Sequence, residues 1–336
     1  MMAALRVDIG LFVQNEADGI APMLAHLAGQ DVLSLAGYDV RVHVLCNGCT
    51  DETVPRAQLA APEGFRVHDL REGGKSRTWN SFVQHLARRD AQVLVFCDTG
   101  IRWPDPACIR QLIDGVTARP DLHVLNSQPV KDIAVNGPKG AVQRLIAASA
   151  GGLDDWRRAI CGQCYAMPGP AARRYLLPIG LPVEDGFLHA MVVTDRFTAA
   201  DNPDLIDGLE GARHIYPSER SLTGLIRHQT RLVVGSAINA AVFRHLKAEG
   251  FERIARELSR AAADDTWLPG VLRLRLPRLP YAYVPFHFAV KRIAHRRPGT
   301  GLLRRIMLKT IGFGFDLIVY LNAQMTMARG VGAGYW

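Results

Sequence analysis

Polar and charged side chains follow four apolar runs in the first hundred residues, each at the point where the run ends. The four segments read FVQNEADGI, CNGCTDET, LREGGKSRTWN and FCDTGI. A lysine beside two glycines, as at Lys75, and free backbone N–H groups at a helix start suit a diphosphate. A carboxylate such as Asp98 can meet a ribose hydroxyl or a hard cation. Turns of this composition end many strands, so one segment alone means little, but four in succession favour a nucleotide site.

Two adjacent acids, Glu184 and Asp185, stand much later in the segment PVEDGFLHAMV. A buried carboxylate there could take a proton from a hydroxyl group as a general base. Acids are also enriched in the first turn of helices, where they complement the helix dipole. From the residues alone, a helix start is the preferred interpretation.

Two C-x-x-C pairs, Cys46 with Cys49 and Cys161 with Cys164, could together form a tetrahedral zinc site. The 111 residues between the pairs greatly exceed the spacing of a compact zinc ribbon. Neither pair has the context of a thioredoxin-like site. Buried small apolar side chains are therefore the favoured role of these cysteines.

The elements that must position these residues alternate between apolar runs and helical patterns. Strands are predicted at RVDIGLFV, DVRVHVLC, FRVHDL, AQVLVFCD, LHVLNS and QCYAMP. Apolar spacings of three and four predict helices over residues 20–27 and 79–86. This alternation is typical of an α/β fold with a mostly parallel sheet flanked by helices, and such sheets bind ligands beyond the carboxyl ends of their strands.

Composition agrees with a folded globular chain. It has 336 residues, of which 48% are apolar and 21% charged, enough for a full core and about two domains. The first apolar stretch contains Arg6 and Asp8, unlike the uninterrupted apolar segment of a secretory signal, so we expect a cytoplasmic protein. In that compartment the six cysteines are expected to be thiols.

The ordered set of motifs resembles the family 2 glycosyltransferases of the GT-A fold. Their first strand ends in a YNE-like element, their second in D-D/N-G-S-T-D-x-T, a third segment carries G-G-K with a following Asn, and a fourth ends in D-x-D. The matching stretches here are QNE, CNGCTDET, GGKSRTWN and CDTG. Further on, GQCYAMPGPAARRYL resembles the acceptor-facing strand and helix, PVEDGFLHAMV the E-D element and RHQTRL a degenerate Q-Q-x-R-W element. The resemblance covers roughly residues 5–235.

The resemblance implies an inverting transfer of a sugar from a nucleoside diphosphate sugar, with UDP favoured, to a hydroxyl of a lipid-linked or saccharide acceptor. It assigns the role of general base to Asp185. Donor binding would fall to Gln14, Asn15, Glu16, Asn47, Lys75 and Asp98. The acceptor or diphosphate side would be formed by Glu184, Gln229 and Arg231.

Several positions depart from the family pattern. Gly100 replaces the second acid of D-x-D, which puts Mg²⁺ or Mn²⁺ binding at Asp98 in doubt unless His189, His228 or Asp185 supplies a ligand. Three further departures are Cys46 for the first acid of the second element, His228 for the first Gln and Leu232 for the Trp. These changes weaken the acceptor-side assignments most.

Positive charge gathers near the C-terminus. The chain has a net charge of +8, and the segment 266–315 has no Asp or Glu but ten basic residues: Arg273, Arg275, Arg278, Lys291, Arg292, Arg296, Arg297, Arg304, Arg305 and Lys309. A solvated basic face or a nucleic-acid patch would have fewer interleaved aromatic and aliphatic residues. We therefore expect a helical, membrane-proximal extension over 237–336 that contacts an anionic membrane surface from the cytoplasmic side, following a GT-A domain over 1–236. No nucleic-acid partner is expected.

Two competing classes remain. One is a protein of the same fold that binds a nucleotide sugar but has lost catalysis, as the glycine at position 100 suggests. The other is a nucleotidyltransferase, whose Gly-rich, Arg-containing loop after the first strand is not matched by QNEADG.

Overall fold

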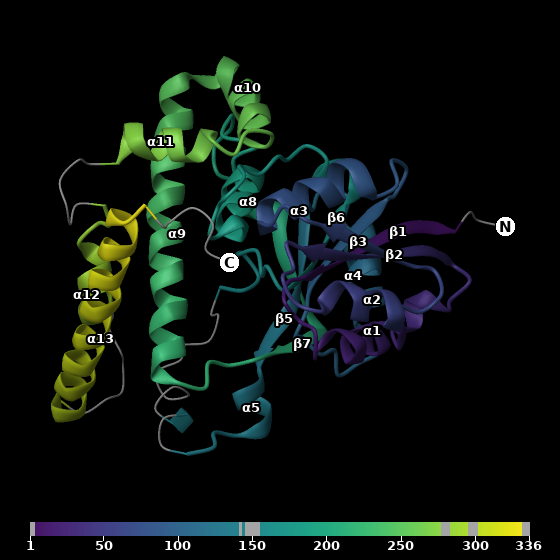
Figure 1. The fold of residues 1–336 in the computed structure, drawn as a ribbon, viewed down its shortest axis with the longest axis horizontal. Coiled ribbons are helices and arrows are strands. Elements are labelled where there is room, and N and C mark those ends of the chain that lie inside the picture. Colours follow the sequence, from purple (N-terminus) through teal and green to yellow (C-terminus); the bar gives the residue numbers. More distant parts are fainter. Residues whose placement is uncertain (1–3, 141–142, 145–154, 277–282, 295–301, 331–336) are drawn as a thin grey trace.

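The computed structural model describes residues 4–140, 143–144, 155–276, 283–294 and 302–330, and its body is a seven-stranded sheet (Figure 1). The strand order is β3-β2-β1-β4-β6-β5-β7. The strands are β1 (Leu5–Val13), β2 (Tyr38–Asn47), β3 (Phe65–Leu70), β4 (Val93–Asp98), β5 (Val124–Lys131), β6 (Cys164–Pro168) and β7 (Ile206–Tyr216).

The sheet is mostly parallel, as predicted. β1 pairs in parallel with β2 and β4, and β5 pairs in parallel with β7, while β6 runs antiparallel to both of its neighbours. All strands except β6 therefore end at one edge of the sheet, where ligands of such folds bind. The six predicted strands are confirmed. β7 was missed because its sequence, IDGLEGARHIY, mixes charged residues and glycines into a half-exposed strand at the edge of the sheet.

Helices cover both faces of the sheet and continue beyond it. They are α1 (Ile20–Ala28), α2 (Thr53–Ala60), α3 (Lys75–Ser81), α4 (Cys108–Thr117), α5 (Asp132–Asn136), α7 (Gly169–Ala172), α8 (Glu184–Val193), α9 (Leu222–Glu249), α10 (Phe251–Ala261), α11 (Trp267–Arg275), α12 (His287–Ala294) and α13 (Leu302–Ala328). The helix predicted at 20–27 is confirmed. The one predicted at 79–86 begins earlier, as α3, and passes into a π-helical turn over Phe82–Leu86.

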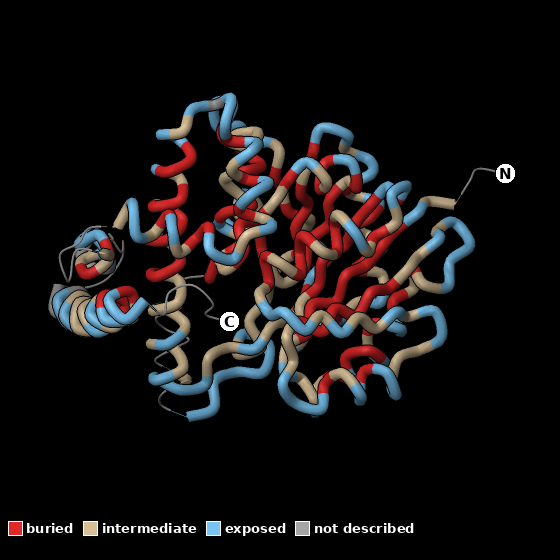
Figure 2. The backbone as a smooth tube through the Cα atoms, turned by 45° about the horizontal axis from the view of Figure 1, so that its top comes forward, coloured by how far each residue is buried: buried red, intermediate tan, exposed pale blue. Residues whose placement is uncertain are grey.

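Successive residues of each central strand enter different hydrophobic cores, because side chains alternate across a sheet. In β4, Val93, Val95 and Cys97 join the core shared with α1 and α4, whereas Leu94 and Phe96 join the core on the other face. That second core continues without interruption into α8, α9, α10 and α11. Figure 2 shows the resulting line of buried backbone running through the sheet.

The C-terminal extension is helical, as expected. α9 is one continuous helix, so the proposed boundary between residues 236 and 237 lies inside it. α13 packs on α12 and α9 (Figure 1). Among the described residues, no helix combines the length and the apolar character needed to cross a bilayer. Arg278, Arg296 and Arg297 of the predicted basic segment lie outside the described residues.

Asp8 of β1 is the centre of a buried network of charged and histidine side chains. Asp8 is fully buried and accepts hydrogen bonds from the Nε and backbone N–H of Arg88, at 2.7 and 2.6 Å. His43 Nε2 lies 3.4 Å from Asp8 Oδ2, and its Nδ1 lies 3.0 Å from Nε2 of His68. Burial and the adjacent His43 lower the pKa of His68 to about 4, so this network holds a neutral imidazole in the interior.

Candidate active site

The loops that follow β2 and β3 pack directly on each other. Asn47 ends β2, and Gly48 adopts a positive φ of 57° that glycine tolerates best. A Cβ at Gly48 would lie only 2.6 Å from the Cα of Gly73, so the two backbones approach as only glycine allows. The backbone N–H of Gly48 donates to the carbonyl oxygen of Leu70 at 2.7 Å. The CNGC turn and the GGK loop thus form one surface at the edge where the strands end.

Two predicted donor-binding residues join the loop after β1 to the turn after β2. Asn15 Oδ1 accepts a hydrogen bond from the backbone N–H of Thr50 at 2.8 Å, and the backbone N–H of Glu16 donates to Thr53 Oγ1 at 2.7 Å. The backbone N–H of Thr50 is therefore not available to a ligand. Asp51 Oδ1 accepts a hydrogen bond from the backbone N–H of Thr53, the first residue of α2, at 3.0 Å.

Unlike Asn15, Asn47 holds no other loop in place through a side-chain hydrogen bond among the described residues. It is fully buried, and within the described part of the chain neither its Oδ1 nor its Nδ2 has a hydrogen-bond partner. A buried amide without partners costs free energy, which a hydrogen bond to a water molecule or a ligand would offset. Gln14 lies directly after β1, at the same edge of the sheet.

Lys75 is the centre of the site. Its Nζ lies 2.7 Å from Asp98 Oδ2 and 3.2 Å from Glu184 Oε1, and it donates to the carbonyl oxygen of Gly162 at 3.3 Å. Only 9% of the lysine side chain is exposed. Burial by itself lowers the pKa of Lys75, but Asp98 and Glu184 raise it above its ordinary value, so the ammonium stays charged. Lys75 thus brings together two predicted acids, Asp98 and Glu184, from distant parts of the chain.

Asp185 lies beside the same group. A Cβ at Gly162 would be 3.2 Å from Asp185 Oδ2, so this carboxylate lies against the residue whose carbonyl oxygen accepts the hydrogen bond from Lys75. Burial and then Glu184 raise the pKa of Asp185 to about 6, while Lys75 opposes the increase. Burial likewise raises the pKa of Asp98, again opposed by Lys75. Sequence reasoning gave Gly162 no role of its own, although it begins the segment GQCYAMPGPAARRYL.

Helix α9 fixes the acids in place. Asn239 Nδ2 donates to the carbonyl oxygen of Val183, the residue before α8, at 3.0 Å. A Cβ at Gly235 would lie 2.2 Å from Val183 Cγ2, so the two elements are in close contact. Arg231 lies one turn earlier on the same face of α9, and its charge lowers the pKa of both Asp98 and Asp185.

Gln229 lies two residues before Arg231 in α9, and positions two apart on a helix point to different faces. The acceptor-side role of Gln229 stays a prediction.

The described side chains of this site do not by themselves form a metal-binding group. Throughout the described ranges, no group of three or more His, Cys, Asp or Glu side chains could hold one. Asp98 Oδ2 is bonded to Lys75, and Gly100 contributes no side chain. Of the substitute ligands considered, His189 directs its Nε2 to the carbonyl oxygen of Arg158 at 2.9 Å, and His228 lies 4.0 Å from Glu219.

The zinc interpretation is also not supported. All six cysteines are free thiols. Cys46 lies in β2 and Cys164 in β6, and β1 and β4 stand between these strands. Three strand spacings amount to about 14 Å, too far for one tetrahedral ion. Burial raises the pKa of Cys46 and of Cys161 to about 12, consistent with inert buried thiols.

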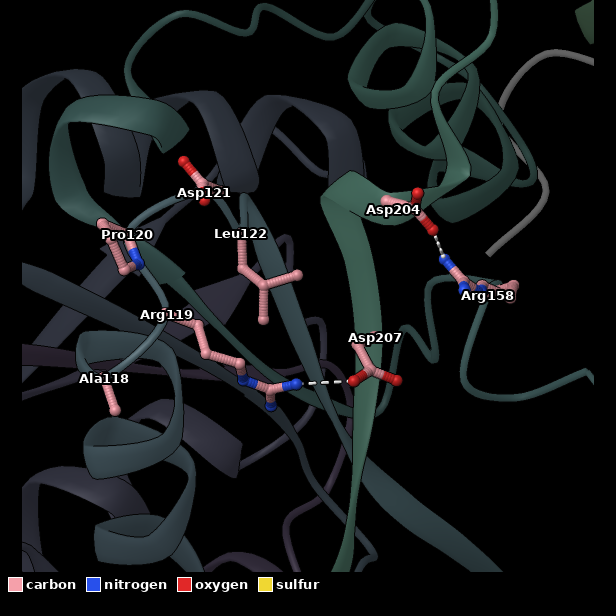
Figure 3. Close-up of a pocket in the computed structure, with 8 residues that line it drawn as sticks. All are labelled: Ala118, Arg119, Pro120, Asp121, Leu122, Arg158, Asp204 and Asp207. Carbon is pink, nitrogen blue, oxygen red and sulfur yellow. Dashed lines mark hydrogen bonds and ion pairs between the residues drawn. The ribbon is translucent and has the colours of Figure 1, made fainter.

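A surface hollow of about 460 Å³ lies away from this site (Figure 3). Its wall includes Leu122, just before β5, and Asp207, near the start of β7, so it opens at the amino ends of these strands. Arg119 pairs with Asp207 at 2.5 Å, and Arg158 pairs with Asp204 at 2.7 Å (Figure 3). These ion pairs occupy four of the five charged residues that line the hollow, and none of the predicted site residues lines it.

Comparison with solved structures shows the fold. A mannosyltransferase from Pyrobaculum calidifontis, in complex with GDP-Man and Mn²⁺, matches with a TM-score of 0.52 and 15% identity, over 96% of this chain and 87% of that one. Mannosyl-3-phosphoglycerate synthase from Rubrobacter xylanophilus matches with a TM-score of 0.49 and 16% identity, over 73% and 75% of the two chains. No family model matches the sequence. No curated protein matches it either.

The sheet topology and the match to the mannosyltransferase define the fold class. The chain has the Rossmann-like GT-A fold. The resemblance in fold that the motifs implied is therefore confirmed.

Proposed function

We propose that this protein is an inverting glycosyltransferase that moves a sugar from a nucleoside diphosphate sugar to an acceptor hydroxyl. The observation that carries the proposal is the meeting of Lys75, Asp98, Glu184 and Asp185 at the carboxyl edge of the sheet. The GDP-Man in the matched mannosyltransferase supports a nucleotide-sugar donor. A UDP-sugar is the donor that we test first, and the acceptor class that we propose is lipid-linked or saccharide.

Asp185 acts as the general base in this proposal. With a pKa of about 6 it is mostly ionised at neutral pH, yet basic enough to take a proton from a hydroxyl group. The acceptor oxygen then forms a bond to the anomeric carbon while the bond to the diphosphate breaks. A base on one side of the sugar and a leaving group on the other give inversion in a single displacement, without a covalent sugar–enzyme intermediate.

The departing diphosphate gains negative charge, which fixed cations stabilise more in the transition state than in the ground state. Lys75 is the cation that we assign to this role. Asn47, Gln14 and the loops held by Asn15 and Glu16 would bind the nucleoside. No step is assigned to a metal ion, since the described residues do not form a site for one.

A donor screen tests this proposal. Thermal shift is measured with UDP, GDP, ADP and CDP, with and without Mg²⁺ or Mn²⁺, and slow hydrolysis of the matching nucleotide sugars is followed by release of the diphosphate. We expect one nucleotide to raise the melting temperature and its sugar conjugate to be hydrolysed. If a nucleotide binds but no sugar is hydrolysed or transferred, the alternative of a binding protein is correct. Binding of none of them would refute the proposal.

We also propose that the C-terminal helices contact an anionic membrane surface at the cytoplasmic side. One face of α13 packs inward through Val319, Ala323 and Met327, which are buried. The other face exposes five large apolar side chains: Ile306, Ile311, Ile318, Leu321 and Met325. Exposed apolar residues on a helix within a basic segment suit an interfacial position on anionic lipid.

Vesicle co-sedimentation tests this placement. The protein should bind vesicles that contain phosphatidylglycerol at low salt, and less at high salt or with phosphatidylcholine alone. The variant Ile311→Glu/Ile318→Glu should lose binding, whereas Leu59→Glu, at a 90% exposed apolar residue on α2, should not. Equal sedimentation of the three proteins would refute this placement.

A further inference from the structure

Three basic side chains lie on the side of the catalytic acids opposite to the CNGC and GGK loops. Lys131 is the last residue of β5, level with Tyr216 of β7, and β6 separates β5 from β4. His228 and Arg231 lie on the second and third turns of α9, which begins beside the ends of β5 and β7 (Figure 1). The two residues are three apart, so they share one face of the helix.

Two of these cations form no ion pair within the parts of the chain that the structure describes, although Arg231 acts at longer range on Asp98 and Asp185. No carboxylate forms an ion pair with Lys131 or with Arg231 there, although both side chains are partly buried. The acid next to Lys131 is occupied, because Asp132 accepts a hydrogen bond from the backbone N–H of Ser218 at 2.8 Å and lies 3.7 Å from Arg220.

The three basic groups also act on one another. Burial lowers the pKa of His228, and the charges of Arg231 and then Lys131 lower it further, while Glu219 opposes them. Arg231 acts on Asp185 and Asp98 at the same time. The basic group therefore extends from the proposed base toward the ends of β5 and β7. Keeping like charges together costs free energy, which a bound anion would offset.

We propose that the acceptor carries a phosphate group near the hydroxyl that receives the sugar, and that Lys131, His228 and Arg231 bind this phosphate. The inference rests on the proposed glycosyl transfer. A phosphate presents several oxygens in different directions, which matches basic groups on two separate elements better than the two coplanar oxygens of a carboxylate. The phosphate could belong to a free metabolite or to a lipid headgroup, since the chemistry recognised is the same.

Matched acceptors test the inference. Transfer from the donor found in the screen is measured to glycerol and to glycerol phosphate in solution. It is also measured to vesicles of phosphatidylcholine that contain either diacylglycerol or phosphatidylglycerol. We expect the phosphorylated member of at least one pair to have a kcat/KM higher by about tenfold or more, because hydrogen bonds to a charged group are the strong ones. Preference in solution indicates a free metabolite, and preference only in vesicles indicates a headgroup.

Variants separate this inference from the proposed function. Lys131→Ala and His228→Ala should each lower kcat/KM for the phosphorylated acceptor about tenfold, yet leave donor hydrolysis without acceptor unchanged. Retained hydrolysis also shows that each variant is folded. Arg244→Ala removes an exposed cation from the far half of the same helix and should change neither rate.

Two results would overturn the inference while leaving glycosyl transfer intact. One is equal use of neutral and phosphorylated acceptors by the unaltered protein. The other is an equal loss for both kinds of acceptor in Lys131→Ala and His228→Ala. If no nucleotide sugar is hydrolysed or transferred at all, the proposed function fails and this inference fails with it.

Discussion

Replacing Asp185 by Asn should remove activity and at the same time stabilise the fold. The side chain keeps its size but loses the charge that burial and Glu184 disfavour. The pKa rises from 3.8 to about 6, and because each unit corresponds to about 1.4 kcal/mol, the ionised carboxylate costs the fold about 3 kcal/mol at neutral pH. Loss of a general base lowers the rate of its reaction by roughly 10²- to 10⁴-fold.

The stabilisation should depend on pH in a defined direction. A carboxyl group whose pKa is higher in the folded state binds its proton more tightly there, so the unaltered protein gains stability as the pH falls from about 6 to about 4. Asparagine has no proton to bind. The difference in unfolding free energy between variant and parent should therefore be largest above pH 6 and vanish below pH 4.

Denaturant unfolding at pH 5, 6, 7 and 8 measures this difference, together with transfer or donor hydrolysis at pH 7.5 and nucleotide binding. Nucleotide binding should survive in the variant. Asp121→Asn, which neutralises an exposed acid, should leave both stability and rate unchanged. An unaltered rate in Asp185→Asn would refute its role as base. Lower stability of the variant at pH 8 would refute the electrostatic reasoning.

Three further predictions follow from the same contacts. Lys75→Met leaves the carboxylates of Asp98 and Glu184 without their cation, so urea unfolding should show a loss of about 3–5 kcal/mol in unfolding free energy. Calorimetry should show a loss of nucleotide affinity. Unchanged values would contradict the ion-pair assignment. Gly235→Ala places a methyl group 2.2 Å from a methyl of Val183 and should cost about 1–3 kcal/mol and lower kcat, whereas Gly270→Ala, with open space around it, should not destabilise. Because the pKa of His68 falls from 6.5 to about 4 on folding, the protein should lose about 3 kcal/mol as the pH drops through this range; His68→Gln should lose less, and equal losses would disprove the assignment.

Much of the architecture could be read from local patterns. The apolar runs at β1, β4 and β6 are buried almost throughout, so their residues are distinctive even without neighbours. β7 lacked this signal because it lies at the edge of the sheet, where charged residues and glycines are tolerated. The direction of β6 was equally hidden, since the pairing of a strand depends on its neighbours and not on its own residues.

The sequence alone determined which side chains could do the chemistry: a lysine after two glycines, an acid at the end of β4, and the pair Glu184–Asp185. Only the tertiary structure decided that they meet, because their separation along the chain is bridged by the shared edge of the sheet and by α9 packing on Val183. The tertiary structure also set the pKa of these groups. Burial beside Glu184 and Lys75 sets the pKa of Asp185. At the start of a solvent-exposed helix, the same aspartate would have an ordinary carboxyl pKa.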